Sequence, residues 1–446
     1  MAPRVPVGCR RACATLVVAA STLVLQATAA EDSRWISWIR ENHHALRQPP
    51  ATNPSSEDDY SDLQFLKEVI GNRRLVQIGE SHHSVAEYGA MKTRLIKFLH
   101  KEMGFDVLAF ESSVYECFAA DLRRLPPAEA LFATIFSVWA FEDVLPLFEY
   151  LKQTQSTARP LAFAGFDPQI SSRTGVVTRP AFFERVVGVL DPTYAREVAH
   201  FDAQFIDRIQ REGPVYARDE EDRLVAFYNR LANYLEANRD ALAEAFPGDA
   251  SPLVAERVAW SSAKLAQLLS SYQNDPNDVT LQGHMAIRDR AMADNLTFLA
   301  RTLHPDKKII VWAANIHVRH ANEKTTWVFP TMGGWLKERF RDELYTIGLY
   351  PNRGTVPGGR AVFTIDPAEP GTMERLLSDA GASRLFVDML NQPPHDGTRW
   401  MYEPMLSRDA SISGPQAMLP VLIVPRDQYD GLLFIDRVSA PRFLSR

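Results

Sequence analysis

The segment from Leu75 to Ser113 changes from a strand-like pattern to a helical one and back, and this alternation limits the possible folds more than any other feature. "RLVQIGE" and "FDVLAFE" are short apolar runs, which are typical of buried strands. Between them, apolar side chains recur at helical spacing: Val85, Tyr88, Met91, Leu95, Phe98, Leu99 and Met103. Strand, helix and strand in this order predict a βαβ unit with parallel strands and a right-handed crossover.

Capping residues are expected at both ends of the predicted helix. Ser84 can cap the N-terminus, with Glu87 three residues later as its partner in a capping box. Gly104 can end the helix as its C-cap. The helix is therefore predicted between Ser84 and Gly104.

Three further apolar runs extend the predicted sheet. "PLAFAGFD" ends at Asp167, "KKIIVWAANIH" ends near His317, and "ELYTIGLY" ends at Tyr350. The sequence between Asp167 and Lys307 has a helical pattern. We therefore expect an α/β fold with a central, mostly parallel sheet flanked by helices. It would form one domain over residues 31–446, with a helical insertion at about residues 178–276.

The first thirty residues have the pattern of a secretory signal peptide. Three arginines precede an apolar run, Ala12–Leu25, and Ala27-Thr28-Ala29 offers a small-residue cleavage site. The run is shorter than the roughly 20 apolar residues that span a bilayer. We expect an exported protein, periplasmic or extracellular, with no stable membrane anchor after cleavage.

Charge and cysteine content limit the partners and the covalent cross-links. Loss of residues 1–30 removes three arginines and no acidic residue, so the net charge falls from −6 to −9. Such an acidic balance argues against a nucleic-acid partner, which would need a basic patch. Cys117 would be the one remaining cysteine, so no internal disulfide is expected.

Polar side chains follow the ends of three predicted strands. Glu80 and His83 come directly after the first strand, Glu111 ends the second, and His317 lies near the end of a later one. The carboxyl ends of parallel strands meet at one edge of the sheet, which is where ligands bind in open α/β folds. We expect these four side chains to lie together there.

Three chemistries are open to this group, and a nucleophilic serine is the least favoured. Ser81 begins like a nucleophile elbow, but His83 stands where that turn requires a second glycine. A histidine oriented by Glu80 or Glu111 fits a general base acting on water or a hydroxyl. His317 would then stabilise negative charge or carry a second proton.

The third chemistry is metal binding by the same four residues. Two imidazoles and two carboxylates form an acceptable ligand set for Zn²⁺, Mn²⁺ or Fe²⁺. The chain has no H-E-x-x-H motif and no Cys/His pair at zinc-finger spacing. The sequence therefore assigns no cofactor, and it leaves a divalent metal as an open alternative.

The segment "IGESHHSVAEYGAMKTRLIKFLHKEMGFDVLAFES" resembles the erythromycin esterase-like family, and later segments match that family in order. They are "WAFEDVLPLFEYLK", "GFDPQ", "RDRAMADNL", "VWAANIHV", "MGGWLKERFRDELYTIGLY" and "YDGLLFIDR", so the resemblance covers most of residues 70–437. It implies an α/β core with a helical insertion and a deep cleft. It also implies hydrolytic opening of a macrolide lactone, an antibiotic-resistance activity, by activated water without a covalent serine intermediate.

The resemblance also implies roles for individual residues. His83 would be the general base, Glu80 would assist it, and Glu111 would complete the carboxylate pair. Lys92 matches a basic position on the first helix, and His317 matches the second histidine of the family's H-N-x-H segment.

A further set of residues is expected to bind the substrate. From the family match, Arg288 and Asp289 belong to this set. Asp167 either lines the same cleft or caps the next segment. The expected substrate is a small-molecule ester or lactone.

Ala314 departs from the family pattern, because it stands where the first histidine of H-N-x-H is expected. Alanine can neither transfer a proton nor bind a metal or an oxyanion. Three functions therefore remain: a hydrolase of an ester or lactone, a metal-dependent hydrolase or peptidase, and a non-catalytic ligand-binding protein.

Overall fold

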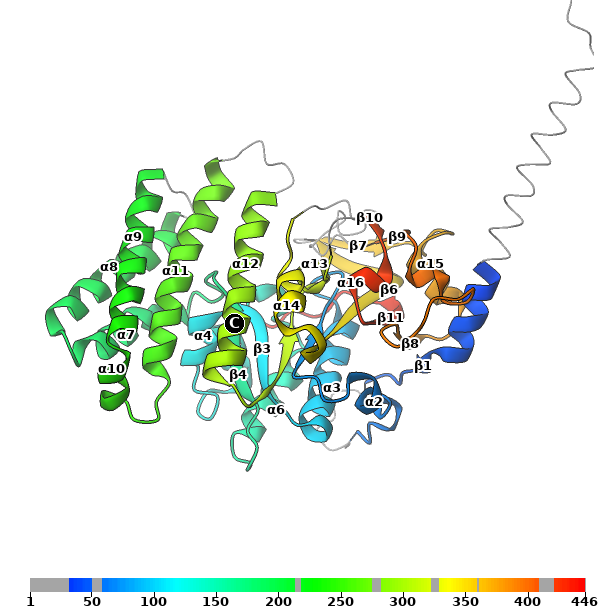
Figure 1. Ribbon diagram of the computed structural model, residues 1–446, viewed down its shortest axis with the longest axis horizontal. Helices are drawn as coiled ribbons and strands as arrows, with labels where there is room; N and C mark the ends of the chain where they lie inside the picture. The colour runs from blue at the N-terminus through cyan, green and yellow to red at the C-terminus, as the bar shows by residue number, and fades with distance from the viewer. Residues whose placement is uncertain are drawn as a thin grey trace, which may run out of the picture.

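The computed structural model describes residues 32–49, 58–212, 218–274, 282–321, 329–358, 361–408 and 421–445. In this part of the chain, nine strands form one mostly parallel sheet with helices packed around it (Figure 1). The predicted signal peptide lies outside the described residues. Within them, no helix combines the length and apolarity needed to cross a membrane.

The strands of the large sheet follow the order β1-β8-β11-β6-β2-β5-β3-β4, and β7 pairs with β6 beside this path. Their bounds are β1 His44–Ala45, β2 Leu75–Ile78, β3 Phe105–Ser113, β4 Ala162–Asp167, β5 Lys308–Trp312, β6 Leu344–Gly358, β7 Ala361–Ile365, β8 Arg384–Asp388 and β11 Gly431–Val438. A separate two-stranded sheet joins β9 (Met405–Ser407) and β10 (Val421–Ile423).

The five central pairings are parallel, which confirms the predicted fold class. β2 pairs with β5 and β6, β3 pairs with β4 and β5, and β11 pairs with β6, all in parallel. The antiparallel pairings lie toward one edge, where β8 joins β11 and β1, and in the β6–β7 hairpin. Ile78 and Phe110 both pair with Trp312, so β2 and β5 end at one level, and β3 continues past it to Ser113.

Helix α3 (Ala86–Met103) follows β2 as predicted, and its apolar stripe is buried against the sheet. Gly104 ends it with φ 74° and donates its N–H to Leu99 O, which confirms the predicted C-cap. The predicted capping box is wrong. Val85 is the N-cap, Ser84 Oγ donates to Val138 O at 2.5 Å, and the Glu87 carboxylate accepts from Ser439.

Two apolar clusters cover the two faces of the sheet. On one face, α3 packs on side chains such as Val76, Ile78 and Ile310. On the other face, α12 (Gln282–Phe298) and α14 (Met332–Phe340) pack on Leu75, Ile309 and Val311. Successive side chains of a strand point to opposite faces of the sheet, so a strand that is buried on both faces contributes alternate residues to each cluster.

A group of helices between β4 and β5 lies to one side of the sheet, at the left of Figure 1. They have an apolar core of their own, which includes Phe183, Tyr228, Leu231 and Val258. The helices of this stretch are α7 Arg179–Gly188, α8 Pro192–Glu212, α9 Arg218–Ala237, α10 Arg239–Ala245, α11 Ser251–Asn274 and α12, which continues into the π-helical turn η4 Leu299–Leu303.

Shorter helices connect the remaining strands. They are an N-terminal helix over residues 32–42, η1 Ser61–Leu63, α2 Leu66–Ile70, α4 Val114–Ala119, α5 Pro127–Thr134, η2 Ser137–Trp139, α6 Leu145–Thr154, η3 Val176–Thr178, α13 Asn315–Val318, η5 Arg341–Glu343, α15 Met373–Asp379, η6 Arg399–Met401 and α16 Pro425–Gln428.

The strand that was expected to end near His317 is shorter than predicted. β5 ends at Trp312, and His317 lies on the single-turn helix α13. Asn315 fixes this turn, because its backbone N–H donates to Glu80 O at 2.8 Å and its side chain bonds the backbone of Leu349. The helix therefore lies against the turn after β2, and His317 still reaches the carboxyl edge.

Candidate active site

The turn between β2 and α3 presents His83 at the carboxyl edge of the sheet. A Cβ atom on Gly79 would lie 2.1 Å from Asn315 Oδ1, so this position accepts only glycine while α13 stays in place. His83 Nδ1 lies 2.9 Å from Glu80 Oε1, and the His83 side chain keeps 17% of its surface exposed. Within the part of the chain that the structure describes, His83 Nε2 makes no hydrogen bond.

Glu80 is buried, and both of its carboxylate oxygens are engaged. Oε2 accepts from Lys92 Nζ at 2.9 Å, while Oε1 accepts from both His83 Nδ1 and Trp139 Nε1, the latter at 2.7 Å. Burial acts to raise the pKa of Glu80, but Lys92 and the hydrogen bond from His83 lower it below its ordinary value. Glu80 is therefore ionised and can only accept. It follows that His83 donates through Nδ1, so neutral His83 has its lone pair on Nε2.

Lys92 is the counterion of Glu80 rather than a group open to solvent. Its side chain is fully buried, and Nζ also donates to Ala313 O at 3.2 Å and lies 4.1 Å from the centroid of the Trp312 ring. Burial lowers the pKa of Lys92 to about 8, against the charge of Glu80, which raises it. Glu80 and Lys92 therefore form a buried ion pair beneath His83.

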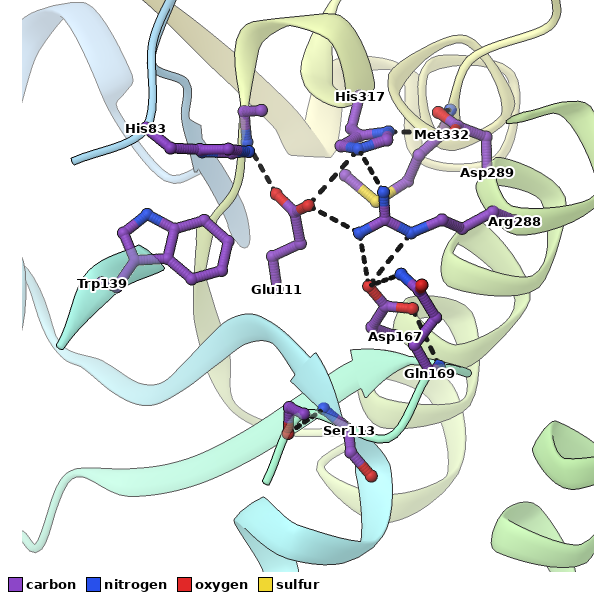
Figure 2. Close-up of polar contacts among 12 residues, drawn as sticks. His83, Glu111, Ser113, Trp139, Asp167, Gln169, Arg288, Asp289, His317 and Met332 are labelled. Carbon is purple, nitrogen blue, oxygen red and sulfur yellow. Dashed lines mark hydrogen bonds and ion pairs between the residues drawn. The ribbon is translucent and has the colours of Figure 1, made fainter. Parts of the chain in front are cut away.

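A second charged group surrounds Arg288 of α12, which reaches from the helical region to the ends of β3 and β4 (Figure 2). Nη2 donates to Glu111 Oε1 at 2.8 Å and to Asp167 Oδ2 at 2.6 Å, and Nε donates to Asp167 Oδ2 at 3.1 Å. Burial acts to raise the pKa of Glu111, but His317 and Arg288 hold it well below its ordinary value. Both carboxylates are almost fully buried, so Arg288 is the cation that makes their burial tolerable.

His317 lies between two carboxylates and Arg288. Its Nδ1 is 2.9 Å from Asp289 Oδ2, and its Nε2 is 3.1 Å from Arg288 Nη1 and 3.3 Å from Glu111 Oε1. Burial acts to lower the pKa of His317, but Asp289 and Glu111 raise it to about 9. The protonated ring donates through Nε2 to Glu111, and the neutral ring accepts there from Arg288.

Asp289 is held too tightly to face a ligand. It is fully buried, and while Oδ2 receives His317, Oδ1 accepts the backbone N–H of Met332 at 2.8 Å. The position of His317 is thus tied to the first turn of α14.

Figure 2 shows how the groups face one another. His83 and Trp139 lie on one side of Glu111, and Arg288, Asp167 and His317 lie on the other. Glu111 Oε2 is held by the backbone N–H of Ala314 at 2.8 Å. His83 and Arg288, with side chains 17% and 14% exposed, are the members of this group that solvent reaches. A small molecule at this edge would therefore contact an imidazole and a guanidinium.

The structure gathers the predicted site residues, but not the other polar side chains that surround them in sequence. Ser81 is buried and its hydroxyl lies 3.0 Å from Tyr88 Oη. His82 is buried and Nδ1 contacts the backbone oxygen of His83. His320 bonds Thr346 Oγ1 through Nε2 at 2.7 Å on the face of the sheet.

Ala314 offers its backbone to the site and its side chain to an apolar cluster. The N–H bonds Glu111, whereas the methyl group is fully buried with Ile316 and Phe329. Within the described residues, His82 and His320 thus stay in their own contacts, and neither supplies an imidazole at this place.

The carboxylate and imidazole groups do not form a metal site in their present arrangement. In the described ranges, no group of three or more His, Cys, Asp or Glu side chains is placed to hold a metal ion. The oxygens of Glu80 face Lys92, His83 and Trp139, and those of Glu111 face Arg288 and Ala314 N–H. The carboxylate oxygens that a metal would need are already used by cations and N–H groups of the chain itself.

Trp139 has a contact with the site that the sequence did not predict. Its indole N–H binds Glu80, and its ring packs edge-on against His83 with centroids 4.8 Å apart. The signal available in the sequence was the family-like segment that begins with this tryptophan, but the segment indicates no role. The role of Asp289 was not predicted either. It was expected to bind the substrate, but it lies behind His317 and accepts a hydrogen bond from it.

Fold and site together define an α/β protein that places histidines, carboxylates and an arginine at the carboxyl edge of a parallel sheet. The chain belongs to the erythromycin esterase family, whose model, described as "Erythromycin esterase", matches residues 100–438. The match to the family model begins after the His83 turn, whereas the alignment to the first relative named below covers 92% of this chain and so includes that turn. The family and the names of the relatives below indicate a hydrolase.

Two relatives cover most of this chain. YbfO of Bacillus subtilis (strain 168), which is provisionally named a hydrolase, is 31% identical over 92% of this chain and 92% of its own length. The erythromycin esterase type II of Escherichia coli is 22% identical over 81% of this chain and 90% of its own length. Among solved structures, an erythromycin esterase mutant, EreC, in its open conformation has a TM-score of 0.68 at 17% identity, covering 91% of this chain and 100% of that one. At that identity the likeness concerns the fold alone.

Proposed function

We propose that this protein hydrolyses an ester or lactone of a small molecule with water activated by His83. The observation that carries the proposal is the tautomer of His83. Ionised Glu80 accepts from Nδ1, and Nε2 remains without a partner among the described residues. A neutral imidazole with a free Nε2 lone pair at a solvent-reached position is what a general base for water requires.

Stabilisation of the transition state would come from the other side of Glu111. Attack on the carbonyl places negative charge on its oxygen, and preorganised donors aimed at that oxygen lower the barrier. A guanidinium has five N–H donors, and with His317 protonated Arg288 uses three of them, in the contacts with Asp167 and Glu111. The hydrogens on Nη1 would serve the oxyanion, with protonated His317 adding positive charge.

The proton balance of the proposed reaction closes on His83. Its Nε2 takes one proton as the water oxygen bonds to the carbonyl carbon. The bond to the alcohol oxygen then breaks, and the proton held on Nε2 passes to that oxygen. The products are a carboxylic acid and an alcohol, or one hydroxy acid from a lactone, and His83 returns to its neutral state.

The alternative of a non-catalytic binder draws on Ala314, whose methyl group offers no imidazole to a ligand. A substrate panel separates the two functions. Purified protein is incubated with simple aryl esters, aliphatic lactones and macrolides, with matched amides as negative controls. Cleavage of an ester or lactone with the amides intact supports the proposal. Binding of panel compounds without product formation for any of them would contradict it and favour the binder.

Export is proposed separately, from the N-terminal sequence pattern. An arginine-containing start, the apolar run Ala12–Leu25 and the small-residue site before Glu31 support it. Expression of the full chain followed by N-terminal sequencing tests it. A mature chain that begins near residue 31 is expected, and an uncleaved N-terminus in a secretion-competent host would contradict export by this route.

A further inference from the structure

We infer that Trp139 is a positioning residue for His83, acting through Glu80. The inference rests on the proposed function of His83 as general base, and it adds a residue from a distant segment to that machinery. The indole N–H donates to the same oxygen, Glu80 Oε1, that receives His83 Nδ1. Trp139 would therefore influence both the geometry and the strength of the hydrogen bond between His83 Nδ1 and Glu80 Oε1, which orients His83.

The hydrogen bonds of Glu80 Oε1 leave no freedom at this oxygen. A carboxylate oxygen offers about two lone-pair directions, and here one takes the indole N–H and the other the imidazole N–H. Oε2 is held by Lys92 at 2.9 Å, so the carboxylate plane cannot rotate without breaking a bond inside the core. The direction from Oε1 to His83 is thus fixed by Trp139 and Lys92 together.

Packing of the indole ring supports the same role. Trp139 is 1% exposed and lies edge-on to Phe110, with centroids 5.3 Å apart, as well as edge-on to His83. A ring held by the core on one side and touching the base on the other limits the rotation of the imidazole about its side-chain bonds. Figure 2 shows the indole beside His83 on the side away from Arg288.

The main chain joins the two segments at a second point. Ser84, next to His83 in a left-handed conformation with φ 58°, donates its hydroxyl to Val138 O at 2.5 Å. Two hydrogen bonds therefore link the His83 turn to η2, which contains Trp139. One runs from Ser84 to Val138, and the other runs from Trp139 to Glu80. A segment more than fifty residues away in sequence holds the base in place.

Removal of the indole N–H has a consequence of definite sign. Glu80 Oε1 would lose one donor, so more of its negative charge would act on the imidazole. A stronger opposite charge favours the protonated form of a histidine, which then titrates at higher pH. Loss of buried aromatic packing elsewhere in the core should leave the midpoint unchanged, which the control variant below measures.

Trp139→Phe tests the inference, because it keeps an aromatic ring and removes the N–H. The probe is diethyl pyrocarbonate, which acylates neutral imidazole. Modification of His83 is followed across pH by mass spectrometry, so the readout needs no substrate. Trp400→Phe is the matched control, since Trp400 is also fully buried and packs in the cluster on the other face of the sheet. Its Nε1 has no hydrogen-bond partner among the residues that the structure describes.

The midpoint of His83 modification is expected to move to higher pH in Trp139→Phe and to stay at the wild-type value in Trp400→Phe. On a substrate that the wild type cleaves, kcat of Trp139→Phe should fall roughly 10-fold with little change in KM. Ser84→Ala is the second variant if Trp139→Phe does not fold, and its midpoint should move in the same direction.

An unchanged or lowered midpoint in the folded Trp139→Phe protein, or an equal shift in Trp400→Phe, would overturn the inference. So would an unchanged midpoint in Ser84→Ala if that variant has to replace Trp139→Phe. Failure of the proposed function looks different. If no ester or lactone is cleaved but the midpoint still rises in Trp139→Phe, the positioning role stands and the hydrolase proposal fails.

Discussion

His317 is held by Asp289, with His317 Nδ1 2.9 Å from Asp289 Oδ2 inside a fully buried pair. The contact fixes the tautomer of the imidazole, and it helps to raise the pKa of His317 to about 9 against the effect of burial. His317 therefore carries a positive charge at neutral pH. In the proposed reaction that charge faces the developing oxyanion.

Asp289→Asn should lower activity by roughly 100-fold, because it removes the charge that keeps His317 protonated. With less support for the imidazolium, the loss of activity at alkaline pH should begin at a lower pH than in the wild type. The pH profile of kcat measures this. Asp306→Asn, at an exposed residue before β5, is the control and should match the wild type. An unshifted alkaline limb in Asp289→Asn would argue against a protonated His317 in the reaction.

Stability should depend on pH through His317. Its folded-state pKa of about 9 exceeds the ordinary value of 6.5, so its stabilising contribution is complete below pH 6.5 and is lost as pH rises through 9. The size expected is about 3 kcal/mol, at about 1.4 kcal/mol per pKa unit. Denaturant titrations of wild type and His317→Gln at pH 6 and pH 9.5 measure it. The stability difference between the two proteins should shrink at high pH, and a difference that grows would contradict the assignment.

Arg288→Met should destabilise the protein by about 3–5 kcal/mol, because it leaves the buried carboxylates of Glu111 and Asp167 without their cation. Arg288→Lys keeps a charge but loses the fork of donors, so it should be more stable than Arg288→Met yet lose roughly 100-fold or more in kcat. Thermal and denaturant unfolding give the first quantity and steady-state kinetics the second.

Arg290→Met is the matched control on the same helix, since Arg290 is exposed and pairs with Asp294 at the surface. Its effect on stability should stay within about 0.5 kcal/mol. Equal destabilisation of Arg288→Met and Arg290→Met would show that Arg288 is not the counterion of the site.

Ala314→His should not create or enhance ester hydrolysis. The methyl group is buried with Ile316 and Phe329, so an imidazole there overpacks the cluster and should cost about 1–3 kcal/mol. The proposed reaction uses His83, Arg288 and His317 and has no step for a further imidazole. Melting temperature and turnover on the ester and macrolide panel check both statements. A gain of macrolide turnover in Ala314→His would show instead that the missing histidine limits the activity of this chain.

The central strands and the meeting of the site residues could be predicted from sequence, because both depend on local patterns and one topological rule. Apolar runs marked β2, β3, β4 and β5, and parallel strands bring Glu80, Glu111 and Asp167 to one edge. The pairing of Arg288 with both carboxylates had no such local sign. Arg288 is separated in sequence from Asp167 by 121 positions and from Glu111 by 177 positions, and it lies on a helix that packs beside the sheet.

The misjudged details share a physical cause. Ser84 has the residue type of a cap, yet it bonds Val138, because the turn is docked against η2. Asp289 follows Arg288 directly, but successive helical residues point in different directions, so it lies behind His317 instead of beside a substrate. Tertiary contacts decided these roles, and a single sequence carries no record of them.

In the proposed mechanism, His83 activates the water that attacks the substrate. The most direct test is kcat/KM of His83→Ala on an ester or lactone that the wild type cleaves, with His200→Ala, an exposed histidine of α8, as control. We expect a loss of roughly 100- to 10,000-fold for His83→Ala, the usual contribution of a general base, and wild-type activity for His200→Ala. Hydrolysis by folded His83→Ala at the wild-type rate would contradict it.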